Sequence, residues 1–215
     1  MVTGAVFLSF FPIALALILS PGPDSVYTLT RSISDGRTAG VMAALGTASG
    51  IVIHTTAVVL GLAALLTTSA VAVAVLKTLG AGYLVYLGVQ TVRTHGDFTL
   101  SPDGGGYSPM ESYRGAFVIN VLNPKVAVFF LAFLPQFVRP GGSFTEQILV
   151  LGVVYAGLSF GYQGLLAVFS ASARRVIMDR PLVQSAVRYA SGSVLVAFGL
   201  SLALESDGLT ADILG

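Results

Sequence analysis

The sequence has no cysteine, and only 10% of its residues are charged. The lack of cysteine excludes disulfides, thiolate metal sites and thiol redox chemistry. Soluble domains carry about 25% charged residues, whereas here residues 41–76 contain no Asp, Glu, Lys or Arg at all. Because roughly 20 apolar residues are enough to cross a bilayer, the shortage of charge predicts a membrane protein. The net charge of +1 gives no indication of a nucleic-acid partner.

Predominantly apolar segments alternate with polar, turn-rich stretches. A backbone inside lipid must satisfy its own hydrogen bonds, and the apolar runs are continuous, so helices are expected rather than strands. The six segments are residues 4–30, 39–66, 71–92, 115–138, 148–168 and 185–204. We therefore expect an all-α membrane protein with six transmembrane helices in a single domain, residues 1–215.

The basic residues are distributed unevenly between the loops. Loops one–two, three–four and five–six, with the helix ends beside them, hold Arg31, Arg37, Arg93, Arg114, Arg174, Arg175, Arg180 and Arg188, against Lys77 and Arg139 on the opposite side. Basic loops stay in the cytoplasm. The pattern predicts a multi-pass protein of the cell (inner or plasma) membrane, with these three loops cytoplasmic and both termini outside.

The two halves of the chain share spaced residues. Gly46-x-x-x-Gly50 recurs 111 positions later as Gly157-x-x-x-Gly161. At the same offset Lys77 and Gly88 match Arg188 and Gly199, and Ser20-Pro21 matches Asn123-Pro124 at an offset of 103. The repeat boundaries are then residues 1–92 and 114–204, with a loop at 93–113 and a tail at 205–215.

A repeated unit of three helices changes sides of the membrane each time, so the halves are expected to be inverted. Inverted repeats are a common plan of secondary transporters and place the substrate site between the halves. The Gly-x-x-x-Gly stretches let helices approach closely, and we expect them to bring segments two and five together.

Proline interrupts segments one and four at equivalent places. Ser20 and Asn123 are favoured N-cap residues, and Pro21 and Pro124 would then occupy the first helical position. Each half is expected to contain a broken helix whose new N-terminus lies inside the membrane and suits an anion. The alternative is a pair of simple proline kinks, which membrane helices tolerate.

Asp24 and Lys125 are the charged residues deepest in the apolar segments, one after each break. Such residues are costly in a bilayer and mark functional sites. Asp24 could hold a proton or a substrate ammonium, and Lys125 a carboxylate. A purely structural ion pair between them, or snorkelling of either one to the interface, remains open.

Other intramembrane polar groups extend this candidate site. Asn120 and Asn123 share a helix face. His54 could relay protons together with Asp24, although a histidine held by a structural hydrogen bond is the simpler interpretation. The predicted substrate-binding residues are Ser20, Pro21, Gly22, Pro23, Asp24, Asn120, Asn123, Pro124 and Lys125. No metal site and no cofactor are expected.

Three motifs together extend over nearly the whole chain. They are Ser20-Pro21-Gly22-Pro23-Asp24 followed by Gly36, Gly40, Gly46 and Gly50; the run KTLGAGYLVYLG from Lys77 to Gly88; and Asn123-Pro124-Lys125 leading into Phe133-Leu134-Pro135-Gln136-Phe137. In these motifs the chain resembles the LysE/RhtB family of amino-acid exporters. The resemblance implies a transporter domain that exports amino acids or related metabolites, driven by protons, and a homodimer. It does not imply one substrate.

The expected function is export of a small amino-acid-like solute in antiport with protons, without enzymatic activity. Export of an inorganic cation is a second possibility, although clusters of metal ligands are absent from the apolar segments. A third possibility is an intramembrane hydrolase, because Gly157-Leu158-Ser159-Phe160-Gly161 fits Gly-x-Ser-x-Gly and Ser159 could pair with His54. That motif normally needs a strand–turn–helix elbow, whereas here it lies in an apolar run.

Overall fold

The computed structural model describes residues 2–62, 70–93 and 106–170, with residues 182, 183, 185, 186, 189, 190, 192–197, 199, 200 and 203. Regular structure in these described residues is entirely helical, which confirms the all-α prediction. Arg174, Arg175, Arg180, Arg188, most of loop 93–113, part of segment six and the tail at 205–215 lie outside the described residues.

The first apolar segment is interrupted where the prolines are. Helix α1 (Gly4–Leu19) and helix α2 (Pro23–Ser34) meet at an angle of 54°. The prediction of Ser20 as N-cap is wrong, because Gly22 is the N-cap of α2 and Pro23 its first residue. A residue before proline avoids the helical region. Since Ser20 and Gly22 both precede prolines, the helix can restart only at Pro23.

The fourth apolar segment is interrupted in the same way. Helix α6 (Pro109–Val121) is followed by α7 (Pro124–Val128), which continues as the π-helical turn η2 (Phe129–Phe133) and the 3-10 turn η3 (Leu134–Phe137), with a bend of 50° at the break. Asn123 is the N-cap of α7, as predicted, and its side chain accepts a hydrogen bond from the backbone of Lys125 at 3.0 Å.

Helix α6 begins earlier than the expected position 115. Ser108 and Glu111 form a capping box around its first turn, in which each side chain accepts a hydrogen bond from the backbone of the other residue. Pro109 follows the cap, where its missing N–H costs nothing. This Ser-Pro-x-Glu signal is visible in the sequence and sets the start of the helix.

Three further helices complete the described part of the chain. They are α3 (Arg37–Ala57), which ends in the π-helical turn η1 (Val58–Leu62), α5 (Ala70–Arg93) and α8 (Phe144–Val168). Residues 37–61 and 144–168 are each long and apolar enough to cross a membrane, and each of the two bent pairs can count as one more span. The described residues thus contain two to four candidate spans by this test.

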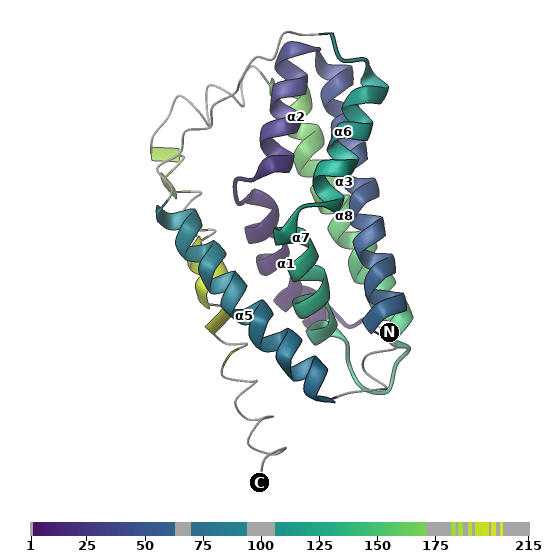
Figure 1. The fold of residues 1–215 in the computed structure, drawn as a ribbon, viewed down its shortest axis with the longest axis vertical. Helices are drawn as coiled ribbons and strands as arrows, with labels where there is room; N and C mark the ends of the chain where they lie inside the picture. Colours follow the sequence, from purple (N-terminus) through teal and green to yellow (C-terminus); the bar gives the residue numbers. More distant parts are fainter. Residues whose placement is uncertain are drawn as a thin grey trace.

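Figure 1 shows α1, α2, α3, α6, α7 and α8 as one bundle, with α5 crossing its side. The two interruptions, α1–α2 and α6–α7, lie at about the same level, near the middle of the bundle. Phe10 of α1, Phe129 of η2 and Tyr155 of α8 pack together, and the ring centroids of Phe10 and Tyr155 lie 6.3 Å and 5.1 Å from that of Phe129. This aromatic contact fixes three helices next to the breaks.

Segments two and five pack together, since a Cβ at Gly152 of α8 would collide with Thr55 of α3, but the Gly-x-x-x-Gly stretches do not make this contact. A Cβ at Gly46 of α3 would collide with the backbone of Tyr113 in α6, and a Cβ at Gly50 would collide with Asn120. Gly157 and Gly161 of α8 have no atom within 4 Å of such a Cβ. The first Gly-x-x-x-Gly therefore packs against segment four, not segment five, and the second is not a packing motif among the described residues.

Alanine at Gly46 should consequently destabilise the protein by about 1–3 kcal/mol, because the added methyl meets rigid backbone. Gly157→Ala is the matched control, since it adds the same methyl to open space on another long helix. Thermal unfolding of the purified protein in detergent measures both. Equal melting temperatures for the two variants would contradict the α3–α6 contact.

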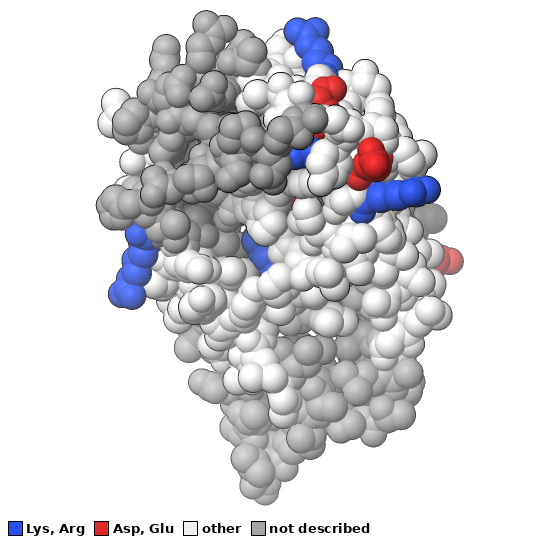
Figure 2. Space-filling view, turned by 45° about the horizontal axis from the view of Figure 1, so that its top comes forward, with Lys and Arg blue, Asp and Glu red and all other residues white. Residues whose placement is uncertain are grey.

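Most of the described charged side chains gather at the end of the bundle that is turned forward in Figure 2, and the remaining described surface is largely uncharged. At this end Arg31 lies in the last turn of α2, not in a loop, and is only 4% exposed. Its Nη1 lies 3.0 Å from Oδ2 of Asp35, and its guanidinium stacks on the ring of Tyr107 at 4.1 Å. Asp35 also accepts hydrogen bonds from the backbone of Gly106 and Tyr107, which ties the end of α2 to the start of α6.

Candidate functional site

A small polar cavity lies where the two breaks meet. About 20 Å³ of it is available to the centre of a water molecule, which is room for about one water. The cavity is lined by Leu17, Ile18, Gly22, Asp24, Ser25, Ile51, Asn120, Lys125, Val126, Tyr155, Ser159 and Gln163. The cavity is therefore too small for an amino acid, and a solute larger than water can bind there only if the helices move apart.

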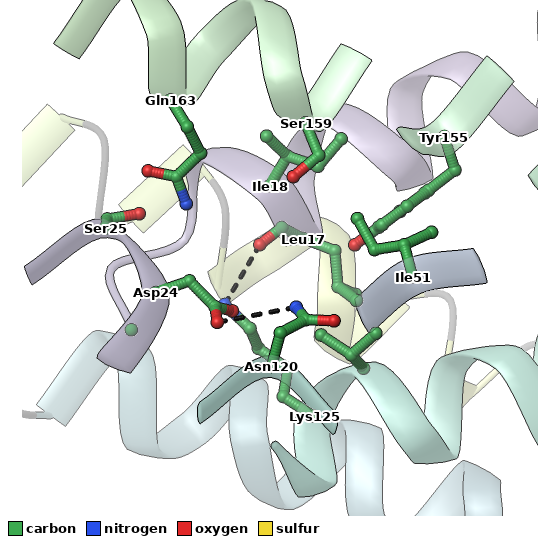
Figure 3. Close-up of a pocket in the computed structure, with 12 residues that line it drawn as sticks. Leu17, Ile18, Asp24, Ser25, Ile51, Asn120, Lys125, Tyr155, Ser159 and Gln163 are labelled. Carbon is green, nitrogen blue, oxygen red and sulfur yellow. Dashed lines mark hydrogen bonds between the residues drawn. The ribbon is translucent and has the colours of Figure 1, made fainter. Parts of the chain in front are cut away.

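Asp24 is held at one wall of the cavity by the other half of the chain. Its carboxylate is 8% exposed and accepts a hydrogen bond from Nδ2 of Asn123 at 2.7 Å and a longer one from Nδ2 of Asn120 at 3.4 Å. Because Asp24 is in the first turn of α2, the positive end of the helix dipole also favours its negative charge. Figure 3 shows the carboxylate beside the Asn120 amide, with a dashed line for the hydrogen bond between them.

Lys125 belongs to the second half of the chain and is held by backbone carbonyls of the first half. Its Nζ donates hydrogen bonds to the backbone carbonyls of Leu17 at 3.1 Å and Ser20 at 3.0 Å. These carbonyls belong to the last turn of α1, where the break removes their helical partners. A cation at a helix C-terminus is favourable, and two of the three N–H donors of the ammonium are used in this way.

Gly22 gives Lys125 the space that this position needs. A Cβ at Gly22 would lie 3.0 Å from Nζ of Lys125, so a larger residue there would push the ammonium away from the α1 carbonyls. Gly22 and Lys125 are also counterparts in the repeat, at the offset of 103 that relates the two breaks. The equivalent residues of the two halves thus meet at the centre of the bundle.

Asp24 and Lys125 do not form a direct salt bridge. No nitrogen–oxygen distance between these two described side chains is within 4.0 Å, because each is engaged by neutral polar groups of the opposite half. The charges nevertheless lie close enough to attract each other. The result is a crossed arrangement, in which the carboxylate of one half and the ammonium of the other face one cavity without neutralising each other directly.

The new helix starts at the two breaks are not equivalent. At α7 the Asn123 side chain accepts the N–H of Lys125, so this end is already capped. At α2 the N-cap is Gly22, which has no side chain to cap the first turn, and Pro23 has no N–H. The first-turn N–H groups of Asp24 and Ser25 in α2 therefore have no side-chain cap.

His54 lies behind the cavity rather than in its lining. Its Nε2 is 3.0 Å from the backbone carbonyl of Asn120, and its ring lies 5.9 Å from that of Phe130. Because a carbonyl only accepts, Nε2 must carry the proton. His54 thereby joins α3 to the last turn of α6 beside the break, which is the structural hydrogen bond that the sequence left open.

The hydrolase alternative finds no geometric support. Residues 157–161 lie in the middle of the continuous helix α8, not at an elbow. Ser159 and His54 are both described, and no hydrogen bond joins them. In the part of the chain that the structure describes, no group of three or more His, Cys, Asp or Glu residues could hold a metal ion.

The predicted site residues divide into three groups. Gly22, Asp24, Asn120 and Lys125 line the cavity. Ser20 and Asn123 are buried and hydrogen-bond the charged side chains from behind. The prolines at 21, 23 and 124 do not line the cavity, and their effect is to place the breaks.

The sequence prediction missed the third wall of the cavity, on α8. Tyr155, Ser159 and Gln163 line it, and so does Ser25 of α2. The three α8 residues recur at intervals of four, which places them on one face of the helix. This polar stripe in an apolar helix was the signal that could have identified them.

Comparisons with known proteins agree on the class of protein. A family model described as "LysE type translocator" matches residues 15–206. The homoserine/homoserine lactone efflux protein of Salmonella typhimurium is 32% identical over 189 residues, covering 87% of this chain and 90% of that protein. An uncharacterized membrane protein of Vibrio cholerae is 32% identical over 202 residues, which are 92% of this chain and 96% of that protein.

A further relative is an uncharacterized membrane protein of Bacillus subtilis, 28% identical over 207 residues, 92% of this chain and 98% of that protein. No solved structure matches. The family model and the 32% identical relatives each cover most of the chain, and the described helices are long and apolar. The chain is therefore a multi-pass membrane transport protein that belongs to the LysE family of translocators.

Proposed function

We propose that this protein exports small amino acids, or closely related metabolites, by alternating access around the cavity between the two breaks. The observation that carries the proposal is the crossed arrangement, in which an aspartate and a lysine from opposite halves face one small cavity. An α-amino acid carries one ammonium and one carboxylate, which are the complements of these two charges.

The contacts of α5 support the inverted-repeat arrangement of six transmembrane helices. Gly88 of α5 lies against Val196, and Gly199 lies against Val85. At the repeat offset of 111, Gly199 is the counterpart of Gly88 and Val196 is the counterpart of Val85. Contacts that exchange partners in this way are those of two units related by a two-fold axis. Transporters of this plan rock one repeat against the other.

The ammonium of the substrate is proposed to bind at Asp24. Its carboxylate lines the cavity, and the amides of Asn120 and Asn123 use only part of its capacity to accept hydrogen bonds. A substrate ammonium has three N–H groups, and its charge strengthens a hydrogen bond to the carboxylate.

The carboxylate of the substrate is proposed to bind at Lys125 and the start of α2. One N–H donor of the Lys125 ammonium is not used by the α1 carbonyls. The uncapped first turn of α2 adds backbone donors and the positive end of its dipole. The Lys125 ammonium and the first-turn N–H groups of α2 both lie at the break between α1 and α2.

Proton antiport is the proposed source of energy. A proton on Asp24 would remove the charge that holds the ammonium, so protonation from outside would release the substrate there. Entry of the proton and exit of the amino acid would then be coupled through one carboxylate. The end that carries Arg31, Arg37 and Arg114 is proposed to face the cytoplasm, following the rule for basic loops.

Transport by purified protein in proteoliposomes tests the proposal. Vesicles with an acidic interior should accumulate labelled L-homoserine from a more alkaline medium, because protons leave as the substrate enters. The controls are vesicles without protein and vesicles whose pH gradient has been collapsed by an ionophore. The proposed function would be rejected if no amino acid in a panel of neutral, basic and acidic ones moved faster than in empty vesicles.

A further inference from the structure

The α8 wall of the cavity carries polar groups that the proposed roles of Asp24 and Lys125 do not use. Tyr155, Ser159 and Gln163 stand one turn apart along the helix, and all three are at most 5% exposed. Figure 3 shows Ser159 and Gln163 projecting from α8 toward the cavity, on the side opposite Asn120 and Lys125. Any solute held between the two charges would present its remaining atoms to this wall.

Gln163 has an unsatisfied acceptor at that wall. The side chain is 3% exposed, and its Oε1 has no hydrogen-bond partner. A buried acceptor without a partner in a native structure needs an explanation. The cavity beside it provides one, because a ligand bound there could donate the missing hydrogen bond.

The charge of the lining limits what that ligand can carry. Among the described residues that line the cavity, Asp24 is the sole carboxylate and Lys125 the sole cationic side chain. Asp24 is the complement of the ammonium of an α-amino acid, and Lys125 is the complement of its carboxylate. A basic or acidic side chain would meet no opposite charge at the α8 wall, whereas a hydroxyl or amide group would meet a hydroxyl and a carboxamide.

We infer that Gln163 and Ser159 determine specificity by hydrogen-bonding an uncharged polar side chain of the transported amino acid. This inference rests on the proposed function and adds to it the class of substrate. Sites built to hydrogen-bond a substrate hydroxyl discriminate strongly against analogues that lack it, because the buried groups of the site are then left unpaired. The two α8 side chains thus select hydroxyl- or amide-bearing amino acids over apolar ones of the same size.

The test compares L-homoserine with L-norvaline, in which a methyl group replaces the hydroxyl. The ratio of kcat/KM for the two substrates is measured in proteoliposomes for the wild type, Gln163→Met, Ser159→Ala and the double variant. The ratio should fall at least tenfold in Gln163→Met and further in the double variant, with norvaline transport maintained or increased. Gly157→Ala, on the same helix but facing open space, should keep the wild-type ratio.

The outcomes separate this inference from the proposed function. Norvaline transport by the variants shows that they are folded and active. If they transport both substrates at the wild-type ratio, or lose both by the same factor, Gln163 and Ser159 do not determine specificity, while amino-acid export stands. If the wild type transports neither these nor any other amino acid, both proposals are overturned.

Discussion

Replacing Lys125 with methionine should reduce homoserine efflux by roughly 10- to 100-fold. Hydrogen bonds to charged groups contribute about 1.5–3 kcal/mol, and each 1.4 kcal/mol is a factor of ten. Methionine has a similar length but cannot donate to a substrate carboxylate. It also leaves the carbonyls of Leu17 and Ser20 without the donors that they have in the structure. Initial rates of labelled homoserine efflux from loaded vesicles measure the effect.

Homoserine lactone separates the two roles of Lys125 in that experiment. The lactone keeps the amino group of homoserine but has no carboxylate. If Lys125 binds the carboxylate, transport of the lactone should fall less than transport of homoserine in Lys125→Met. An equal loss for both would mean that Lys125 only stabilises the break, and would contradict its proposed contact with substrate. If the wild type moves homoserine but not the lactone, homoserine amide, which also lacks the carboxylate, replaces the lactone in the comparison. Homoserine transport unaffected by the variant excludes both roles.

Replacing Asp24 with asparagine should abolish accumulation driven by a pH gradient. Asparagine has nearly the same shape and keeps one acceptor oxygen for the shorter hydrogen bond, the one from Asn123, so the fold should persist. It cannot take up a proton, and it holds an ammonium less strongly than a carboxylate does. We expect exchange of homoserine across the membrane to fall about tenfold, because the hydrogen bond from the substrate ammonium to a charged group is lost. The remaining transport should not depend on pH.

The neighbours of Asp24 remain titratable in that variant. Lys125 and His54 interact electrostatically with Asp24, and Tyr155 does so from α8. His54→Gln is the matched variant, because its side-chain amide can still donate to the Asn120 carbonyl. It should keep coupling to the pH gradient. Gradient-driven accumulation that survives in Asp24→Asn but is lost in His54→Gln would transfer the proton-carrying role to His54.

The sequence predicted the breaks but not the register of the first one. Proline within an apolar run is a strong local signal, and Asn123-Pro124 gives an N-cap and first helical residue as expected. Ser20-Pro21 looks the same, yet the second proline of the Pro-Gly-Pro motif delays the helix start to Pro23. In residues 20–23, the backbone restriction on a residue that precedes proline determines where the helix starts, and the N-cap preference of serine does not.

The contacts across the cavity could not be derived from the sequence alone. The hydrogen bond from Lys125 to Ser20 joins residues 105 positions apart, and the one from Asn123 to Asp24 joins residues 99 apart. The sequence indicated that both charges lie near the breaks, so opposite charges suggested an ion pair. Which partner each charge chooses depends on which carbonyls and amides the breaks leave exposed, and that is a property of the folded chain.

The same limit explains the misplaced glycine contact. A Gly-x-x-x-Gly stretch indicates that some helix approaches closely, but it does not identify that helix. Gly46 and Gly50 face α6 because the Tyr113 and Asn120 positions of α6 lie against α3 at that level. By contrast, the four-residue spacing of Tyr155, Ser159 and Gln163 was a local pattern, and it could have predicted the α8 wall.

Protection of a single cysteine by substrate tests the location of the site most directly. The chain has no native cysteine, so Ser25→Cys places one thiol in the cavity lining, and Ser49→Cys places one on the outer face of α3. A saturating concentration of homoserine should slow the reaction of a small thiol reagent with Cys at position 25 at least fivefold and leave the rate at position 49 unchanged. Equal rates at position 25 with and without homoserine, in protein that still transports it, would show that the substrate does not bind between the breaks.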